Sequence, residues 1–135
     1  MAYYVGILDG RGKVWGVRVP DLPGVHGGGK SPEDAIADAV KAAREWAAHQ
    51  TTRGIMIPAP RSVQKIKADA SLGVDLAAGE SLVMIPLVID SGRPVKANIS
   101  LDAGQLEAID AEATRRGLTR SAFLASAALA LIARP

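Results

Sequence analysis

The chain has 135 residues, of which 48% are hydrophobic and 22% are charged, and its formal net charge is +2. This size and composition suit one ordinary domain or two small ones with a packed core, which excludes wholesale disorder. The chain has no cysteine, which excludes disulfides, thiolate catalysis and cysteine-based zinc sites. It also has no apolar run of roughly eighteen residues, so we expect no membrane-spanning helix.

The first elements that the sequence predicts are two strands of a hairpin. Aromatic and branched residues from Tyr3 to Leu8 form the first strand, and Val14 to Val19 form the return strand. Between them, residues 9–13 are a turn, because an Asp-Gly pair readily supplies the positive φ angles that a hairpin needs. The run of three glycines at positions 27–29 is expected to be flexible.

A long amphipathic helix follows, from about Pro32 to about Thr52. Ser31 can cap its first turn, Pro32 suits the first helical position, and the acidic residues Glu33 and Asp34 suit the positive end of the helix dipole. Apolar residues spaced by three and four predict the face that packs on a core. They are Ala35, Ile36, Ala39, Val40, Ala43, Trp46 and Ala47.

The remainder of the front part is less regular. We expect an extended segment at 55–60, a short helix at 62–68, a loop at 69–80 and a strand at 82–88. The last strand is apolar on both sides, so both of its faces should be covered. Residues 90–94 have the composition of a linker, which divides the chain into domains at 1–90 and 95–135.

The tail begins with an alternating segment, Val95–Leu101, which has the period of a β-strand. Two amphipathic helices follow, one from about Ala103 to Arg116 and one capped by Thr119. One strand and two helices cannot cover the strand's apolar side or satisfy its backbone groups. The simplest remedy is a second copy of the strand, paired antiparallel across a two-fold axis. Such a ribbon fits the DNA major groove. The inward residues would be Ala97, Ile99, Leu101, Leu106, Ile109, Ala113, Phe123, Leu124, Ala127, Ala128 and Leu131.

This tail resembles the ribbon-helix-helix family of transcription regulators, through its strand, its Gly-Leu-Thr-Arg-Ser turn and its second helix. Physical chemistry supports the likeness, because the polar face of the strand carries side chains able to bond base edges. By resemblance, the base readers are Lys96, Asn98 and Ser100. The turn residues Thr119, Arg120 and Ser121 begin a helix, whose free N–H groups suit a DNA phosphate. One departure is Gly104, which weakens the start of the first helix.

Charge distribution is compatible with DNA binding but weakly informative. Positions 1–92 hold ten basic and ten acidic residues, and positions 93–135 hold six basic and four acidic ones. The small positive excess therefore lies in the tail, and it is not a strong electrostatic signature.

The front part resembles the HicB antitoxin family. The likeness rests on Pro20-Asp21-Leu22-Pro23-Gly24-Val25, on Ser31-Pro32-Glu33-Asp34-Ala35, on Ile57-Pro58-Ala59-Pro60-Arg61-Ser62 and on Val83-Met84-Ile85-Pro86-Leu87, in that order ahead of the tail. The resemblance implies an α+β protein with a partial ribonuclease-H-like β-β-α-β domain. It also implies that this domain neutralises a HicA-type mRNA-cleaving toxin and that the tail represses the operon at its operator DNA. A homodimer through the tail strand is implied, and a tetramer if the front domains also pair.

Three residues are candidate toxin contacts. Trp15 could be an interface anchor, and Asp21, beside Leu22, could compete for a basic RNA groove on the toxin. The competing interpretation of Asp21 is a turn residue. Glu33 and Asp34 are acidic candidates too, although helix capping explains them better.

The sequence gives no support to an enzyme, a metal site or a cofactor. Two-metal chemistry needs converging carboxylates, and the apolar runs 3–8, 14–19 and 82–88 contain none. His26 and His49 are the only histidines, and the glycine-rich stretch lacks the ending of a phosphate loop. The start of the chain lacks the pattern of a secretory signal, so we expect a cytoplasmic protein. Three alternatives stay open: a stand-alone regulator that senses a small ligand, an orphan antitoxin, and a relic nuclease.

Overall fold

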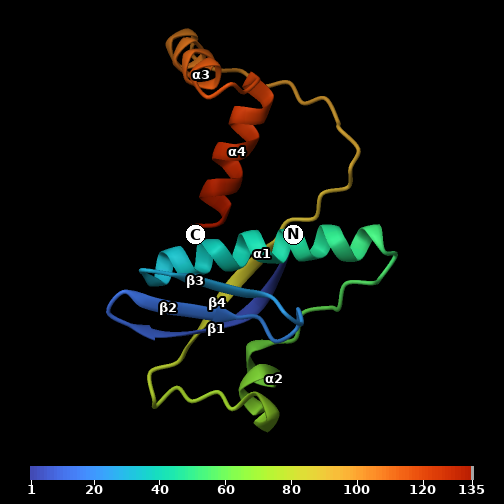
Figure 1. The fold of residues 1–135 in the computed structure, drawn as a ribbon. Coiled ribbons are helices and arrows are strands. Elements are labelled where there is room, and N and C mark those ends of the chain that lie inside the picture. Colours follow the sequence, from blue (N-terminus) through green and yellow to red (C-terminus); the bar gives the residue numbers. More distant parts are fainter. Residues whose placement is uncertain (135) are drawn as a thin grey trace.

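The computed structural model describes residues 1–134 and shows a mixed α+β protein (Figure 1). Its one four-stranded sheet has the order β3-β2-β1-β4, and each pair of neighbouring strands is antiparallel. The sheet contains β1 (Ala2–Arg11), β2 (Val14–Arg18), β3 (His26–Gly29) and β4 (Ser81–Leu87). The predicted strands 3–8, 14–19 and 82–88 are therefore confirmed.

The β1–β2 hairpin is tighter than the sequence predicts. Strand pairing continues to Arg11 opposite Val14, so Gly10 lies in β1 and the turn is short. Gly10 has φ 146°. A Cβ atom at this position would lie 2.3 Å from the carbonyl oxygen of Val14. The turn predicted at residues 9–13 was too wide, because Gly10 lets the two strands approach closely and stay paired up to Arg11.

Helix α1 (Pro32–Thr52) packs across one face of the sheet. The predicted cap is confirmed, since the Ser31 hydroxyl accepts a hydrogen bond from the Asp34 backbone N–H at 3.1 Å. The predicted apolar face meets the sheet to form the main core, with Ile36 and Trp46 only partly buried. Its buried members are Tyr4, Leu8, Val17, Val19, Leu22, Val25, Ala35, Ala39, Val40, Ala43, Ala47, Ile85 and Leu87.

Strand β3 corrects the prediction that residues 27–29 are flexible. It pairs with β2 and lies so close to α1 that a Cβ atom on Gly27 would stand 2.4 Å from the Ala39 nitrogen. The Gly28 N–H donates to the Asp38 carboxylate at 2.9 Å. Glycine here permits close packing of strand on helix, and this strand is one edge of the sheet.

The opposite face of the sheet carries a smaller cluster. Helix α2 (Val63–Ala68) and the short 3₁₀ helix η1 (Ala70–Leu72) cover Val5 and Ile7 through the fully buried Ile66. Leu82 packs in this cluster and Ile85 in the main core, so both faces of β4 are partly covered, although Met84 is 44% exposed. The sequence did not predict η1, which lies in the expected loop.

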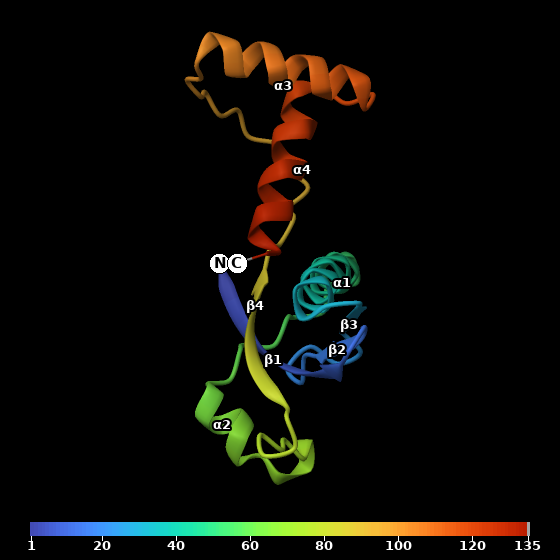
Figure 2. The ribbon, with the colours of Figure 1, turned by 90° about the vertical axis from the view of Figure 1, so that its left-hand side faces the viewer.

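The tail contains helices α3 (Ala103–Arg115) and α4 (Arg120–Ile132). Between β4 and α3, residues 88–102 form neither helix nor strand. The last turn of α4 stands end-on against α1, as both views show (Figures 1 and 2). The predicted strand at 95–101 has no partner strand in the single chain, and the proposed domain division stays a prediction.

Candidate functional site

The tail segment presents two different rows of side chains to solvent. The predicted readers Lys96, Asn98 and Ser100 are all exposed. The alternate apolar row is exposed as well, with Ile99 60% and Leu101 38% accessible. Apolar side chains exposed in a row on one chain often mark a surface that contacts a partner. This arrangement is compatible with pairing of a second strand.

The tail helices hold each other through few contacts. Ala113 is their one buried residue in the described part of the chain, and the Leu118 N–H closes the turn by donating to its carbonyl oxygen at 2.8 Å. Part of the expected inward face is open: Leu131 is 73% accessible and Ala127 and Ala128 are exposed. Two short helices cannot cover each other completely, so the expectation of a buried α4 face is not met within one chain.

The start of α4 has mainly structural contacts in this state. Thr119 is the predicted N-cap and accepts from the Ala122 N–H at 3.1 Å. Both Nε and Nη2 of Arg120 donate to Asp110 of α3 at 2.8 Å, and these bonds hold the pKa of Asp110 below its usual range. Ser121 is exposed. A DNA phosphate bound by Arg120 would therefore have to share the Arg120 guanidinium with Asp110.

Ion pairing leaves the unpaired positive charge of the tail near residues 93–96. Arg115 and Arg116 both bond to Glu112, which lowers the pKa of that carboxyl to about 2. Within residues 1–134, Arg93 and Lys96 make no ion pair, in contrast to the other four basic side chains of the tail. The unpaired cations therefore precede or belong to the polar row, where a phosphate backbone could meet them.

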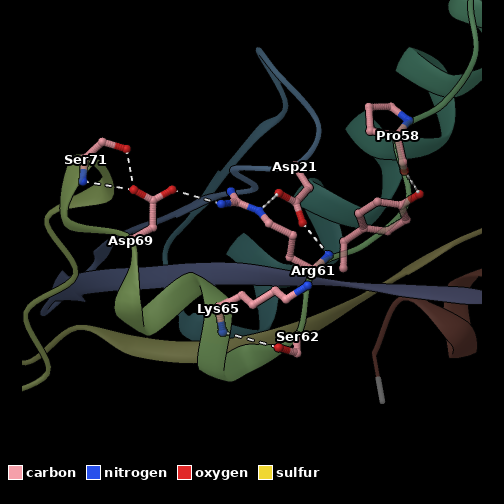
Figure 3. Close-up of polar contacts among 8 residues, drawn as sticks. Asp21, Pro58, Arg61, Ser62, Lys65, Asp69 and Ser71 are labelled. Carbon is pink, nitrogen blue, oxygen red and sulfur yellow. Dashed lines mark hydrogen bonds and ion pairs between the residues drawn. The ribbon is translucent and has the colours of Figure 1, made fainter.

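In the front part, Asp21 is a buried structural residue. It is only 9% accessible. Its Oδ1 accepts from Arg61 Nε at 2.6 Å and its Oδ2 accepts from the Arg61 backbone N–H at 2.7 Å (Figure 3). Both oxygens are engaged inside the fold, so Asp21 presents little surface to a partner, and its role as a toxin contact stays a prediction.

Arg61 extends this network to a second carboxylate. Its Nη1 donates to Asp69 at 2.9 Å, and Asp69 also accepts from the Ser71 hydroxyl at 2.6 Å (Figure 3). The bonds from Ser71 and then from Arg61 lower the pKa of Asp69. Sequence reasoning missed the network, because Asp21 and Arg61 are 40 positions apart and no local pattern joins them.

The other two toxin-contact candidates, Leu22 and Trp15, differ in how far they are buried. Leu22 is 0% accessible and belongs to the main core, so it cannot touch a partner while the domain is folded. Trp15 is half-buried against the same core and its Nε1 donates to the Gly12 carbonyl oxygen at 3.0 Å. Of the three candidates, Trp15 alone offers more than a marginal exposed surface.

No helix in the described chain has the length and apolar character needed to cross a bilayer. Residues 1–134 also contain no group of three or more histidine or acidic side chains placed to hold a metal ion. His26 and His49 are both exposed, on β3 and near the end of α1.

Comparison with known proteins identifies the family. A family model described as "HicB_like antitoxin of bacterial toxin-antitoxin system" matches residues 3–128. The crystal structure of the Burkholderia pseudomallei antitoxin HicB is 30% identical, with 96% of this chain and 97% of that chain covered and a TM-score of 0.56. No curated protein matches the chain.

Two toxin–antitoxin complexes share the fold. The HicA3 and HicB3 complex is 19% identical, covers 65% of this chain and 98% of that chain, and has a TM-score of 0.50. The toxin–antitoxin complex from Streptococcus pneumoniae is 18% identical. The match covers 93% of this chain and 95% of that chain, and its TM-score is also 0.50. On the match over residues 3–128 and the likeness to the Burkholderia protein, the chain belongs to the HicB-like family of bacterial antitoxins.

Proposed function

We propose that this protein is an antitoxin that neutralises a small HicA-type, mRNA-cleaving toxin and represses its own operon by binding operator DNA as a homodimer. The family match along residues 3–128 carries this proposal, because it spans both the front part and most of the tail. Two structures with the same fold are toxin–antitoxin complexes. This supports a toxin as the partner.

The proposed toxin-binding part is residues 1–90, in which we place the partial ribonuclease-H-like outline. Inhibition would be steric, with the front domain covering the toxin's catalytic groups, and the domain itself would not be an enzyme. Asp21 and Leu22 hold the β2–β3 loop to the core and to the segment before α2. They would support the shape of the binding surface from beneath, while Trp15 would contribute directly.

The proposed DNA-binding part is a ribbon-helix-helix dimer of residues 95–134. Pairing of two copies of Val95–Leu101 would cover the exposed apolar row that includes Ile99 and Leu101. It would also turn Lys96, Asn98 and Ser100 outward on a two-stranded ribbon of the kind that enters a major groove. The cations Lys96 and Arg93 would then lie near the phosphates.

Co-purification tests the toxin part. The full chain, tagged and expressed in its own cells, should retain a small basic protein that carries a histidine, in fixed stoichiometry by native mass spectrometry. Recovery of promoter DNA without such a protein would contradict the antitoxin proposal and favour the stand-alone regulator. A matched experiment would co-express the toxin with the antitoxin and measure cell growth. Failure of a folded antitoxin to restore growth would contradict neutralisation.

An operator shift assay tests the DNA part separately. The full chain should shift its promoter fragment with nanomolar affinity at low salt, and affinity should fall steeply as salt rises because phosphate contacts release counterions. A dimer in light scattering that shifts no promoter DNA would leave the toxin proposal standing and overturn the repressor proposal.

A further inference from the structure

The tail touches the front domain through a single turn of α4. Ala133 packs against the main core, and the Arg134 guanidinium donates through Nη2 to the Asp34 carboxylate of α1 at 2.9 Å. Figure 2 shows α4 reaching the front domain by its carboxyl end alone. The contact is therefore end-on, and it buries little of α4.

Packing at this contact is incomplete. A cleft of about 290 Å³ lies between α1 and the last turn of α4, with Val40 and Val88 on one side and Leu129 and Ile132 on the other. A second hollow of about 210 Å³ lies beside it, next to Ile36 and Arg134. Atoms that line such gaps lose dispersion contacts, so shape complementarity does not lock the tail in place.

The polar links across the contact are also sparse. Among residues 1–134, the Arg134–Asp34 pair is the one side-chain bond between residues 95–134 and the front domain, and both side chains are about half exposed. Exposed pairs of this kind are weak and are screened by salt. The tail is therefore held by an interaction that solution conditions can weaken.

The connecting segment permits the tail to move. Arg44 fixes its start, since Nε and Nη2 donate to Asp90 at 2.6 and 2.8 Å. The next residues, 91–102, are exposed and form neither helix nor strand. Residues 95–101 are the segment proposed to pair in the dimer, so the free tether is residues 91–94, and four extended residues reach up to about 14 Å. This length lets α4 leave α1 without disturbing either part.

We propose that the seat of α4 on α1 is a switchable joint, docked through Ala133 and the Arg134–Asp34 pair, and that on release the tail moves about the tether at residues 91–94. Small interfaces between domains of one chain allow relative motion by default, and this one combines a single apolar turn with one exposed ion pair. The joint would set the orientation of the DNA-reading segment relative to the front domain. The docking and release of the joint can be tested without the toxin or the operator, whereas its effect on the DNA-reading segment rests on the proposed function.

The chain's lack of cysteine makes the joint directly measurable. Spin labels on the exposed positions Ala48 of α1 and Ala111 of α3, each changed to cysteine, report the distance between the two parts by double electron–electron resonance. Labelled protein is mixed with a large excess of unlabelled full-length chain, so that distances within one protomer dominate even in a dimer. A narrow distribution at low salt that broadens reversibly at high salt, with an unchanged circular dichroism spectrum, is the expected result.

Charge variants identify the pair responsible. Arg134→Glu should give the broad distribution even at low salt, and the double reversal Asp34→Arg with Arg134→Glu should restore the narrow component. Arg53→Glu makes the same charge change on an exposed residue of the front domain that has no ion pair in the described chain, and it should leave the distribution unchanged. A broad wild-type distribution at low salt, or a narrow one that ignores both salt and Arg134→Glu, would overturn the joint. A folded double variant, Asp34→Arg with Arg134→Glu, whose distance distribution stays broad would also overturn the joint.

Discussion

Arg61 bonds the same carboxylate twice, once by its side chain and once by its backbone. Its Nε donates to Asp21 Oδ1 at 2.6 Å, and its N–H donates to Asp21 Oδ2 at 2.7 Å. The pair fastens the loop between β2 and β3 to the segment before α2. Because the Asp21 side chain is 7% exposed and that of Arg61 is 36% exposed, the charge is shielded on one side of the pair and hydrated on the other.

Removing this carboxylate should destabilise the front domain. Asp21→Ala leaves the backbone N–H and the Nε of Arg61 without their acceptor, although Nη1 keeps Asp69, and we expect a loss of about 1–3 kcal/mol in the free energy of unfolding. Asp21→Asn keeps one neutral acceptor and should lose less. Urea unfolding followed by tryptophan fluorescence reports this domain alone, because Trp15 and Trp46 both belong to it. Asp9→Ala, an exposed carboxylate on β1, is the control, and equal losses for both alanine variants would contradict the assignment.

Adjacent glycines of β3 give a second, internally matched prediction. A Cβ atom on Gly27 would stand 2.4 Å from backbone atoms of α1, whereas one on Gly28 would meet nothing closer than 3.7 Å. Gly27→Ala should therefore separate strand from helix and cost about 2–4 kcal/mol. Gly28→Ala should change stability by about 0.5 kcal/mol or less. Thermal unfolding of the two variants compares them, and similar midpoints would argue against the close contact of β3 and α1.

The two faces of the tail segment should respond differently to mutation. Ile99→Asp places a charge in the apolar row, so it should abolish both the dimer and operator binding. Asn98→Ala changes the opposite face and should keep the dimer while losing about 1–3 kcal/mol of discrimination between the operator and a mutated site. Light scattering and shift assays separate these outcomes. An Ile99→Asp protein that is still dimeric would place the dimer interface elsewhere.

Acid should weaken α3 through Glu112. Arg115 and Arg116 hold the pKa of Glu112 at about 2 in the folded chain, against an ordinary value of 4.5. A lowered folded-state pKa contributes stability above the ordinary value, and that contribution is lost as pH falls from 4.5 through 2. Carbon-13 titration of the Glu112 carboxyl should show the low midpoint. In Glu112→Gln, stability should depend less on pH in this window, while Glu107→Gln on the same helix should behave like the wild type.

Periodic patterns and helix caps predicted the elements whose signals are local. The strands read from the aromatic and branched residues of β1 and β2, the three-and-four spacing of α1 and the caps at Ser31 and Thr119 are all confirmed by the structure. Strand β3 escaped prediction because glycines have no side-chain pattern. What makes them a strand is the nearness of α1, which lies later in the sequence.

The candidate site was less predictable for a related reason. Asp21 reads as a turn residue until Arg61, far along the chain, is known to lie beside it. Leu22 follows the same loop into the core. In the tail, the alternation from Val95 to Leu101 shows which side chains share a face. The hydrogen bonds of a β-sheet there would need a second strand, which the described part of the single chain does not provide. The pairing and the assignment of its readers stay predictions.

Each outer strand of the sheet has one backbone position that cannot donate a hydrogen bond to an added strand. On β3, the Asp38 carboxylate already accepts the Gly28 N–H, and on β4, Pro86 has no N–H to offer. Exposed edges otherwise act as templates for intermolecular sheet growth. A dimer through the tail would tether two front domains at an effective concentration that is typically millimolar for short linkers. The engaged Gly28 N–H and Pro86 would then hinder fusion of the tethered sheets through these edges.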